Sequence, residues 1–147
     1  MRGKFPEYKT LDLSRVNKDI LKIWDRDNIF FKSIRQLNGK GEYIFYEGPP
    51  SANGMPGIHH VLSRTIKDAI CRYRTQCGYE VKRKAGWDTH GLPIELGVEQ
   101  ALGITKEDIG TEKISIEEFN RACRIDVMKY TDQWEDLTHR MGYWVNM

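Results

Sequence analysis

Two adjacent histidines, His59 and His60, follow a loop that is rich in glycine and proline. The loop and the histidines together span residues 48–60 and hold three glycines and three prolines, so the backbone can turn sharply and approach a ligand closely. A helix that begins at this loop directs free N–H groups and a partial positive charge toward it, and both suit a phosphate group. Each histidine can also donate a hydrogen bond to a phosphate oxygen. The pattern fits phosphate binding, and it also fits an ordinary loop with surface histidines.

A second candidate stretch, residues 86–95, follows a short run with strand character and contains Asp88. An ionised carboxylate only accepts hydrogen bonds, so Asp88 is suited to an ammonium group. The alternative is that Asp88 caps the following helix and that Trp87 belongs to the core. Because both candidate loops follow strands, and ligands of open parallel sheets gather at the carboxyl ends of strands, we expect the loops to face one crevice.

The elements that position these loops follow from residue patterns. Glu42 to Tyr46 and Tyr79 to Ala85 are typical of strands. We expect a helix from Ser14, as its cap, to about Asn28. Further helices are predicted from about His60 to near Gly78, from Leu92 to Leu102, and from a capping box of Ser115 and Glu118 to about Met141. The order predicts an α/β fold with a βαβ unit, in which two parallel strands are joined by a right-handed crossover.

Apolar residues recur at helical spacing in two of these helices. In the helix predicted from about His60 to near Gly78, one face comprises Leu62, Ile66, Ala69, Ile70 and Tyr73. The inner side of the last helix comprises Phe119, Ala122, Val127, Tyr130, Trp134, Leu137 and Met141. Because parallel sheets are covered on both faces and two strands make a poor sheet, we interpret the sequence as part of a larger domain.

Composition excludes several classes of protein. The chain has 147 residues, of which 39% are hydrophobic and 30% charged, which is typical of a globular protein rather than a disordered one. A net charge of +2 does not by itself indicate nucleic-acid binding. Three cysteines, Cys71, Cys77 and Cys123, lack zinc-ligand spacing, and we expect reduced thiols, no metal site and a cytoplasmic location. No signal peptide or membrane-spanning stretch is expected.

The run from Gly48 to His60 resembles the first signature of the class I aminoacyl-tRNA synthetases, in which the loop ends in a His-x-Gly-His motif. Thr65-Ile66-Lys67-Asp68 follows at the family spacing and fixes the register. In this register Gly57 replaces the first histidine, Ile58 is the variable position, His59 replaces the glycine, and His60 is the second histidine. The first histidine and the glycine are thus exchanged, and His59 is a candidate to replace the missing histidine from a different backbone position.

The second stretch, Gly86-Trp87-Asp88-Thr89-His90-Gly91-Leu92-Pro93-Ile94-Glu95, is similar to the isoleucyl branch of that family. The resemblance covers essentially the whole chain. It implies activation of isoleucine with ATP and Mg2+, followed by transfer to tRNA(Ile). It also implies catalytic roles for His60 and His59, and a substrate pocket formed by Gly48, Pro49 and Asp88. The implied ATP site consists of Pro50, Ser51, Ala52, Asn53, Gly54, Gly57, Ile58, His59 and His60.

The resemblance further implies the N-terminal half of a Rossmann-like, parallel-sheet nucleotide-binding domain, with an N-terminal helix and a long C-terminal helix. We expect residues 1–41 to be an extension and residues 42–147 to be the first part of the catalytic domain. The sequence lacks the family's second signature, Lys-Met-Ser-Lys-Ser, so we expect an incomplete, inactive fragment whose partners include the remainder of the synthetase chain. The basic run 82–84 is interpreted as a solvated strand end or a contact with the tRNA acceptor end. The alternatives are a non-catalytic nucleotide-binding module and another nucleotidyltransferase with the same loop.

Overall fold

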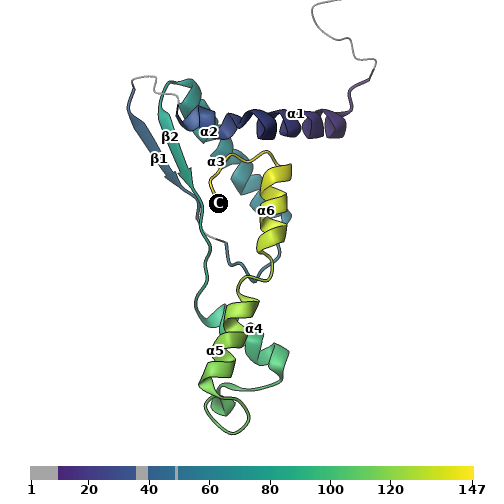
Figure 1. Ribbon diagram of the computed structural model, residues 1–147, viewed down its shortest axis with the longest axis vertical. Coiled ribbons are helices and arrows are strands. Elements are labelled where there is room, and N and C mark those ends of the chain that lie inside the picture. The colour runs from purple at the N-terminus through teal and green to yellow at the C-terminus, as the bar shows by residue number, and fades with distance from the viewer. Residues whose placement is uncertain (1–9, 36–39, 49) are drawn as a thin grey trace, which may run out of the picture.

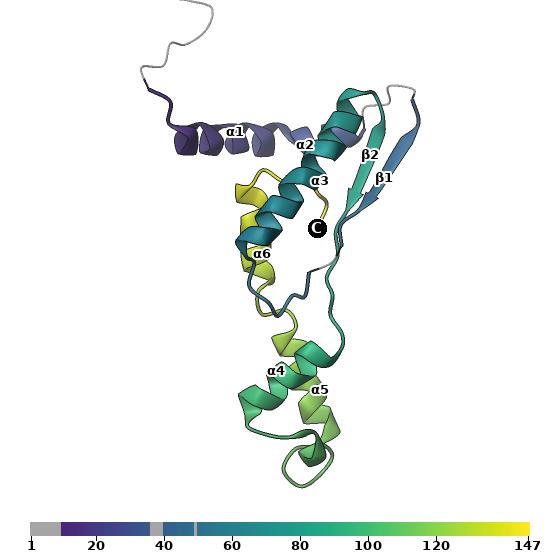
Figure 2. The same cartoon turned by 180° about the vertical axis from the view of Figure 1, so that it is seen from behind.

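A computed structural model describes residues 10–35, 40–48 and 50–147 of the chain (Figure 1). The elements in chain order are α1 (Leu13–Asp27), α2 (Ile29–Ile34), β1 (Glu42–Tyr46), α3 (Ile58–Gln76), β2 (Glu80–Lys84), α4 (Leu92–Leu102), the 3-10 helix η1 (Lys106–Asp108), α5 (Ile116–Asp126) and α6 (Thr131–Arg140). The strands and α4 with α5 lie toward opposite ends of an elongated molecule, and α3 and α6 lie between them (Figures 1 and 2). The predicted α/β class is confirmed.

The two strands form a parallel pair with α3 as the connection between them, as the sequence predicted. The register places Glu42 opposite Glu80 and Tyr46 opposite Lys84. Side chains of β2 alternate between the two faces, so Val81 and Arg83 are buried while Lys82 and Lys84 are exposed. The solvated strand end predicted for the basic run is therefore wrong for Arg83, which donates to Asp68 and Thr75.

The parallel ladder does not stop where the strands end. Beyond β1 and β2, Ser51 and Asp88 form an isolated parallel bridge, and Lys84 forms another with Asn146. Asn146 N–H donates to the carbonyl of Arg83 at 3.1 Å, and Ala85 N–H donates to the carbonyl of Asn146 at 2.8 Å. The last residues of the chain thus pair with the edge of β2 that β1 leaves free.

Helix α3 turns its apolar face outward. The apolar face that the sequence predicted is exposed in the described structure, with 65% of Leu62 and 61% of Tyr73 accessible. The residues buried from this helix are Arg64 and Cys71. The sequence pattern identified an apolar stripe correctly, but in the described part of the chain no element packs on it. This exposure agrees with the interpretation of the chain as part of a larger domain.

The predicted single helix from Ser115 to Met141 is wrong in one respect, because it is two helices. Ser115 and Glu118 form the predicted capping box at the start of α5. The helix ends at Asp126, and α6 starts at Thr131 after a turn. In this turn the N–H of Tyr130 donates to the carbonyl of Ala52 at 3.2 Å rather than continuing the helical ladder. A tertiary hydrogen bond to a distant loop, which sequence periodicity cannot show, accompanies the break.

The first helix also begins earlier than predicted. Asp12, not Ser14, is the N-cap of α1, and its carboxylate accepts a hydrogen bond from Arg15 N–H at 3.0 Å. Asn28 ends the helix in the left-handed conformation with φ 51°, which asparagine tolerates better than most residues. Residues 1–9 of the predicted N-terminal extension lie outside the described residues. No helix in the described ranges is long and apolar enough to cross a membrane.

A buried polar cluster joins the end of β1 to α3 and to the C-terminal segment. Glu47 is 6% exposed and accepts hydrogen bonds from Lys67 Nζ, at 2.6 Å, and from the Tyr143 hydroxyl. Burial, followed by the hydrogen bond to Glu47, raises the pKa of Tyr143, so its phenol stays protonated and donates. Nearby, the Arg64 guanidinium donates to the Thr138 hydroxyl at 2.8 Å. These contacts attach the start of the first candidate loop to the body of the protein.

The Tyr143 contact yields a stability prediction. Tyr143→Phe removes the hydroxyl and leaves one buried lone pair of Glu47 without its donor, so we expect a loss of about 1–3 kcal/mol in the free energy of unfolding. Tyr79→Phe is the matched control, because Tyr79 is half-buried and its hydroxyl has no hydrogen bond within the described residues. The measurement is urea unfolding of the 147-residue chain, followed by circular dichroism. Equal unfolding of the two variants would contradict the assigned role of Tyr143.

Candidate functional site

The two candidate loops lie side by side, as expected from their positions after parallel strands. The N–H of Asp88 donates to the carbonyl of Pro50 at 3.0 Å, and the N–H of Ala52 approaches the carbonyl of Asp88 at 3.5 Å. These bonds continue the β1–β2 ladder beyond the strands. The backbone alone therefore brings the glycine-rich loop next to the carboxylate that the sequence singled out.

The glycine-rich loop is braced from the C-terminal half of the chain. Ala52 is fully buried, and its carbonyl accepts the N–H of Tyr130. The carbonyl of Gly54 accepts the indole N–H of Trp134 at 2.7 Å. Within the loop, Gly54 N–H donates to the Ser51 carbonyl at 3.1 Å, which closes a tight turn. These hydrogen bonds define the shape of the loop.

His60 is fixed by a hydrogen bond in the first turn of α3. Its Nδ1 accepts the N–H of Gly57 at 2.9 Å, so in the neutral ring the proton resides on Nε2. Burial, followed by the positive charge of His59, Arg64 and Lys67, lowers the pKa of His60. The neutral imidazole is therefore favoured near pH 7. It offers an Nε2–H donor at a helix N-terminus.

His59 lies against its neighbour and against the glycine that precedes the helix. The rings of His59 and His60 have centroids 3.8 Å apart. A Cβ added at Gly57 would come within 2.8 Å of Cε1 of His59, so the ring of His59 occupies the space that a side chain at position 57 would enter. Gly57 has φ −117° and ψ 172°, a conformation that any residue adopts. A glycine at position 57 therefore leaves room for the ring of His59, and the backbone conformation does not require it.

Asp88 is exposed, and its carboxylate has no hydrogen bond or ion pair within the part of the chain that the structure describes. The alternative in which Asp88 caps α4 is wrong, because Gly91 is the N-cap residue and no side chain caps the helix. Trp87 is half-buried, with its ring centroid 6.4 Å from that of Trp134. The carboxylate of Asp88 is thus available to a ligand beside the glycine-rich loop.

The remaining predicted site residues differ in accessibility. Gly48 and Gly54 are exposed, Pro50, Ser51 and Asn53 are partly buried, and Ile58 is 82% exposed as the first residue of α3. Pro49 lies outside the described residues. All the described members of the predicted ATP set belong to one continuous loop and the first turn of one helix, so their proximity follows from the chain itself.

Sequence reasoning missed the residues that hold the loops. Trp134 and Tyr130 were assigned only to the inner side of a long helix, and Glu47 and Lys67 were given no structural role. The sequence held one signal for Trp134: the N–H of a buried indole needs an acceptor, and the backbone carbonyls of its own helix are already used by the helical hydrogen bonds. The carbonyl of Gly54 could be identified as that acceptor only from the fold.

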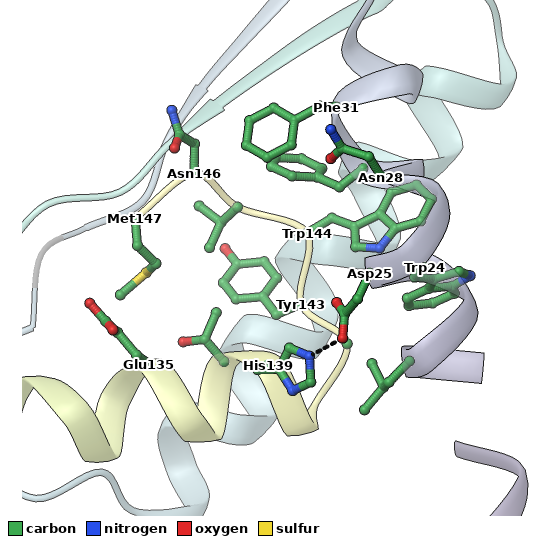
Figure 3. Close-up of a pocket in the computed structure, with 15 residues that line it drawn as sticks. Trp24, Asp25, Asn28, Phe31, Glu135, His139, Tyr143, Trp144, Asn146 and Met147 are labelled. Carbon is green, nitrogen blue, oxygen red and sulfur yellow. Dashed lines mark hydrogen bonds and ion pairs between the residues drawn. The ribbon is translucent and has the colours of Figure 1, made fainter. Parts of the chain in front are cut away.

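A cavity of about 570 Å³ lies away from both loops, between α1, α2, α6 and the C-terminal segment (Figure 3). Trp24, Phe31, Tyr143 and Trp144 contribute aromatic walls, and an ion pair of His139 with Asp25 lies at its edge. The cavity contains none of the predicted site residues, so we do not assign the site to it. Among the described residues no group of three or more histidine, cysteine, aspartate or glutamate side chains is arranged to hold a metal ion.

Comparison with known proteins identifies relatives over the whole chain. An isoleucine–tRNA ligase of Bacteroides thetaiotaomicron is 67% identical over 147 residues, which are 100% of this chain and 13% of the relative. That of Porphyromonas gingivalis is 64% identical over the same shares, and that of Streptomyces avermitilis is 50% identical over 98% of this chain and 14% of the relative. The chain therefore spans about one seventh of the length of these relatives.

Residues 19–147 match the family described as tRNA synthetases class I (I, L, M and V). This match covers most of the chain and includes both candidate loops. It agrees with the resemblance of the Gly48–His60 and Gly86–Glu95 stretches and with the parallel βαβ unit that presents them. The chain belongs to the class I tRNA synthetase family.

Proposed function

We propose that the chain forms part of the site at which an isoleucine–tRNA ligase activates isoleucine with ATP. The observation that carries the proposal is the bridge between Ser51 and Asp88, which places a phosphate-type loop beside an available carboxylate at the ends of parallel strands. The names of the relatives support isoleucine as the amino acid. The whole reaction remains a proposal, because the chain spans 13% of the first of these relatives.

In this proposal ATP, carried with Mg2+, lies along the glycine-rich loop, from Pro50 to His60. The N-terminus of α3 and the Nε2–H of His60 contribute positive potential and a donor toward the phosphates. Isoleucine lies beside Gly48, Pro49 and Asp88, with its ammonium group on the Asp88 carboxylate. The backbone ladder that joins Asp88 to the loop then sets the distance between the two substrates.

The chemistry is a displacement at phosphorus. A carboxylate oxygen of isoleucine forms a bond to the α-phosphorus of ATP, the bond to the bridging oxygen of the β-phosphate breaks, and pyrophosphate leaves with the electron pair. No protein nucleophile is needed, so the residues act by positioning the substrates and stabilising charge. In this proposal His60 donates from Nε2–H to a phosphate oxygen as charge develops, since its Nδ1 accepts from Gly57 N–H.

The second step of the proposal transfers the isoleucyl group to the 3′ end of tRNA(Ile). We propose that residues 42–147 are the first part of the catalytic domain, that residues 1–41 precede it, and that the rest of a synthetase chain completes the site. The exposed apolar face of α3 supports a covering partner of this kind. We expect the enzyme to act in the cytoplasm.

The test of the proposal is isoleucine-dependent exchange between ATP and pyrophosphate, catalysed by a full-length enzyme that carries this segment. Asp88→Ala should lower kcat/KM for isoleucine by roughly two to three powers of ten, since in the proposal the bound substrate desolvates the pair, and breaking one side of a buried ion pair costs about 3–5 kcal/mol. Asp88→Asn should recover part of the loss, because its amide oxygen still accepts a hydrogen bond. The dependence on ATP should change little in either variant.

Asp132→Ala is the control for Asp88, because Asp132 is an exposed carboxylate on α6 and is expected to leave exchange unchanged. A loss below about fivefold in Asp88→Ala, the size of an exposed ion pair, would show that Asp88 does not bind the ammonium group. Binding of ATP without isoleucine-dependent exchange in the unmodified enzyme would support the non-catalytic nucleotide-binding module instead. Exchange that depends on a different acid would support another nucleotidyltransferase.

The two nitrogens of His60 can be tested separately in the same enzyme. His60→Asn retains an acceptor near the position of Nδ1, so we expect the Gly57 contact and the stability to persist while turnover falls by about tenfold to a hundredfold. His60→Gln retains a donor near the position of Nε2, so turnover should fall less and the melting temperature more. The measurements are kcat for exchange and thermal unfolding. The opposite order of effects would exclude phosphate donation by Nε2–H.

The exchanged histidine and glycine suggest a paired test. If the ring of His59 takes over the phosphate contact of a histidine at position 57, His59→Gly should slow exchange by about tenfold. Adding Gly57→His should then restore the rate. Gly57→His alone should also slow exchange, since its Cβ would meet the ring of His59. Full activity of the single variant His59→Gly would refute the catalytic role of His59. His139→Ala, which removes an exposed histidine of α6 outside both candidate loops, is the control.

A further inference from the structure

Trp134 is the side chain at which the parts of the candidate site meet. It is 1% exposed, and its indole N–H donates to the carbonyl of Gly54 at 2.7 Å. Gly54 belongs to the glycine-rich loop, 80 residues earlier in the chain. A buried tryptophan usually satisfies its N–H, but here the acceptor is a loop that is proposed to touch substrate. The bond therefore acts on the shape of the site as well as on the core.

The ring of Trp134 contacts the side chains of both candidate loops. Its centroid lies 4.7 Å from that of His60, with the planes inclined at 74°, which is an edge-to-face contact. It lies 6.4 Å from the ring of Trp87, the residue before Asp88, at 70°. Edge-to-face aromatic pairs of this kind restrict the orientation of both rings. The orientation of His60 is thus fixed by Gly57 on one side and by Trp134 on the other.

Trp134 is itself held rigidly. The guanidinium of Arg64, which is 2% exposed, lies 4.8 Å from the centre of its ring. Arg64 also donates to Thr138, whose hydroxyl donates to the carbonyl of Trp134 at 2.6 Å. One turn earlier, Tyr130 N–H bonds to Ala52. The start of α6 is therefore anchored to the loop at two points and to α3 at a third.

We infer that Trp134 is a positioning residue for the activation reaction, which holds the Gly54 carbonyl and the His60 ring in the geometry that ATP requires. The inference rests on the proposed function. It adds to that function a residue outside both sequence motifs, on a helix whose break at residues 127–130 brings it to the loop. Trp134 touches no substrate in this arrangement and acts through Gly54 and His60.

The experiment compares two substitutions in a full-length enzyme that carries this segment. Trp134→Phe keeps a ring beside His60 and Trp87 but removes the N–H donor to Gly54. We expect it to weaken ATP binding about tenfold, while the dependence of exchange on isoleucine changes less than twofold. Trp134→Leu also removes the ring, so we expect a further fall in kcat. The control is Trp144→Phe, which alters a ring that packs on Trp24 and Arg72, away from both loops.

The readouts are ATP affinity by titration calorimetry, exchange kinetics for each substrate, and thermal unfolding. Weaker ATP binding by Trp134→Phe at a temperature where the variant is fully folded supports the inference. A lower melting temperature with unchanged ATP and isoleucine dependence shows a purely structural role and overturns it. Trp134→Phe decides the question if Trp134→Leu does not fold. If the unmodified enzyme binds ATP without exchange, the proposed function fails, but the affinity of Trp134→Phe still tests the role of Trp134.

Discussion

The parallel pairing of β1 with β2 is the constraint on which the rest of the candidate site depends. Its register runs from Glu42 opposite Glu80 to Tyr46 opposite Lys84, and the next parallel bridge joins Ser51 to Asp88, so the segment after β1 contains one residue more than the segment after β2. A shift of one residue would turn Val81 and Arg83 outward and place a different residue beside Ser51. The strand register sets which face of β2 is buried, and the position of Asp88 next to the glycine-rich loop depends on that register together with the additional residue between Tyr46 and Ser51.

Buried charged groups maintain this alignment against the rest of the molecule. Glu47, directly after β1, is neutralised by Lys67 of α3 and hydrogen-bonded by Tyr143, while Arg83 of β2 pairs with Asp68 at 3.1 Å. Each pair joins a strand to the crossover helix, so sliding of α3 along the sheet would leave a buried charge without its partner. Such pairs contribute modestly to net stability, but breaking one of them is costly. They therefore favour one arrangement of strands and helix over its neighbours.

Local patterns in the sequence predicted the elements well, and tertiary contacts account for what they missed. Strand β1 and helix α4 have the predicted bounds, and Ser115 caps α5 as expected, because strand propensity, a proline in the first turn and a capping box are all local signals. The break before α6 depends on the carbonyl of Ala52, far away in sequence. Asp12 and Ser14 are both good capping residues and lie two positions apart, so the sequence alone could not decide which of them begins α1.

For the candidate site, the sequence identified the loops but not the geometry within them. Residue types suggested phosphate donors at positions 59 and 60, yet only the structure shows that Nδ1 of His60 is already used by Gly57. That bond assigns the proton to Nε2 and leaves one nitrogen for a ligand. It also forms one half of a capping box, in which the residue at the third helical position accepts from the N–H of the N-cap residue, while glycine has no side chain to form the other half. In this chain the capping of α3 and the orientation of a proposed catalytic histidine are therefore one interaction, so a change that loosens the first turn of the helix also releases the ring.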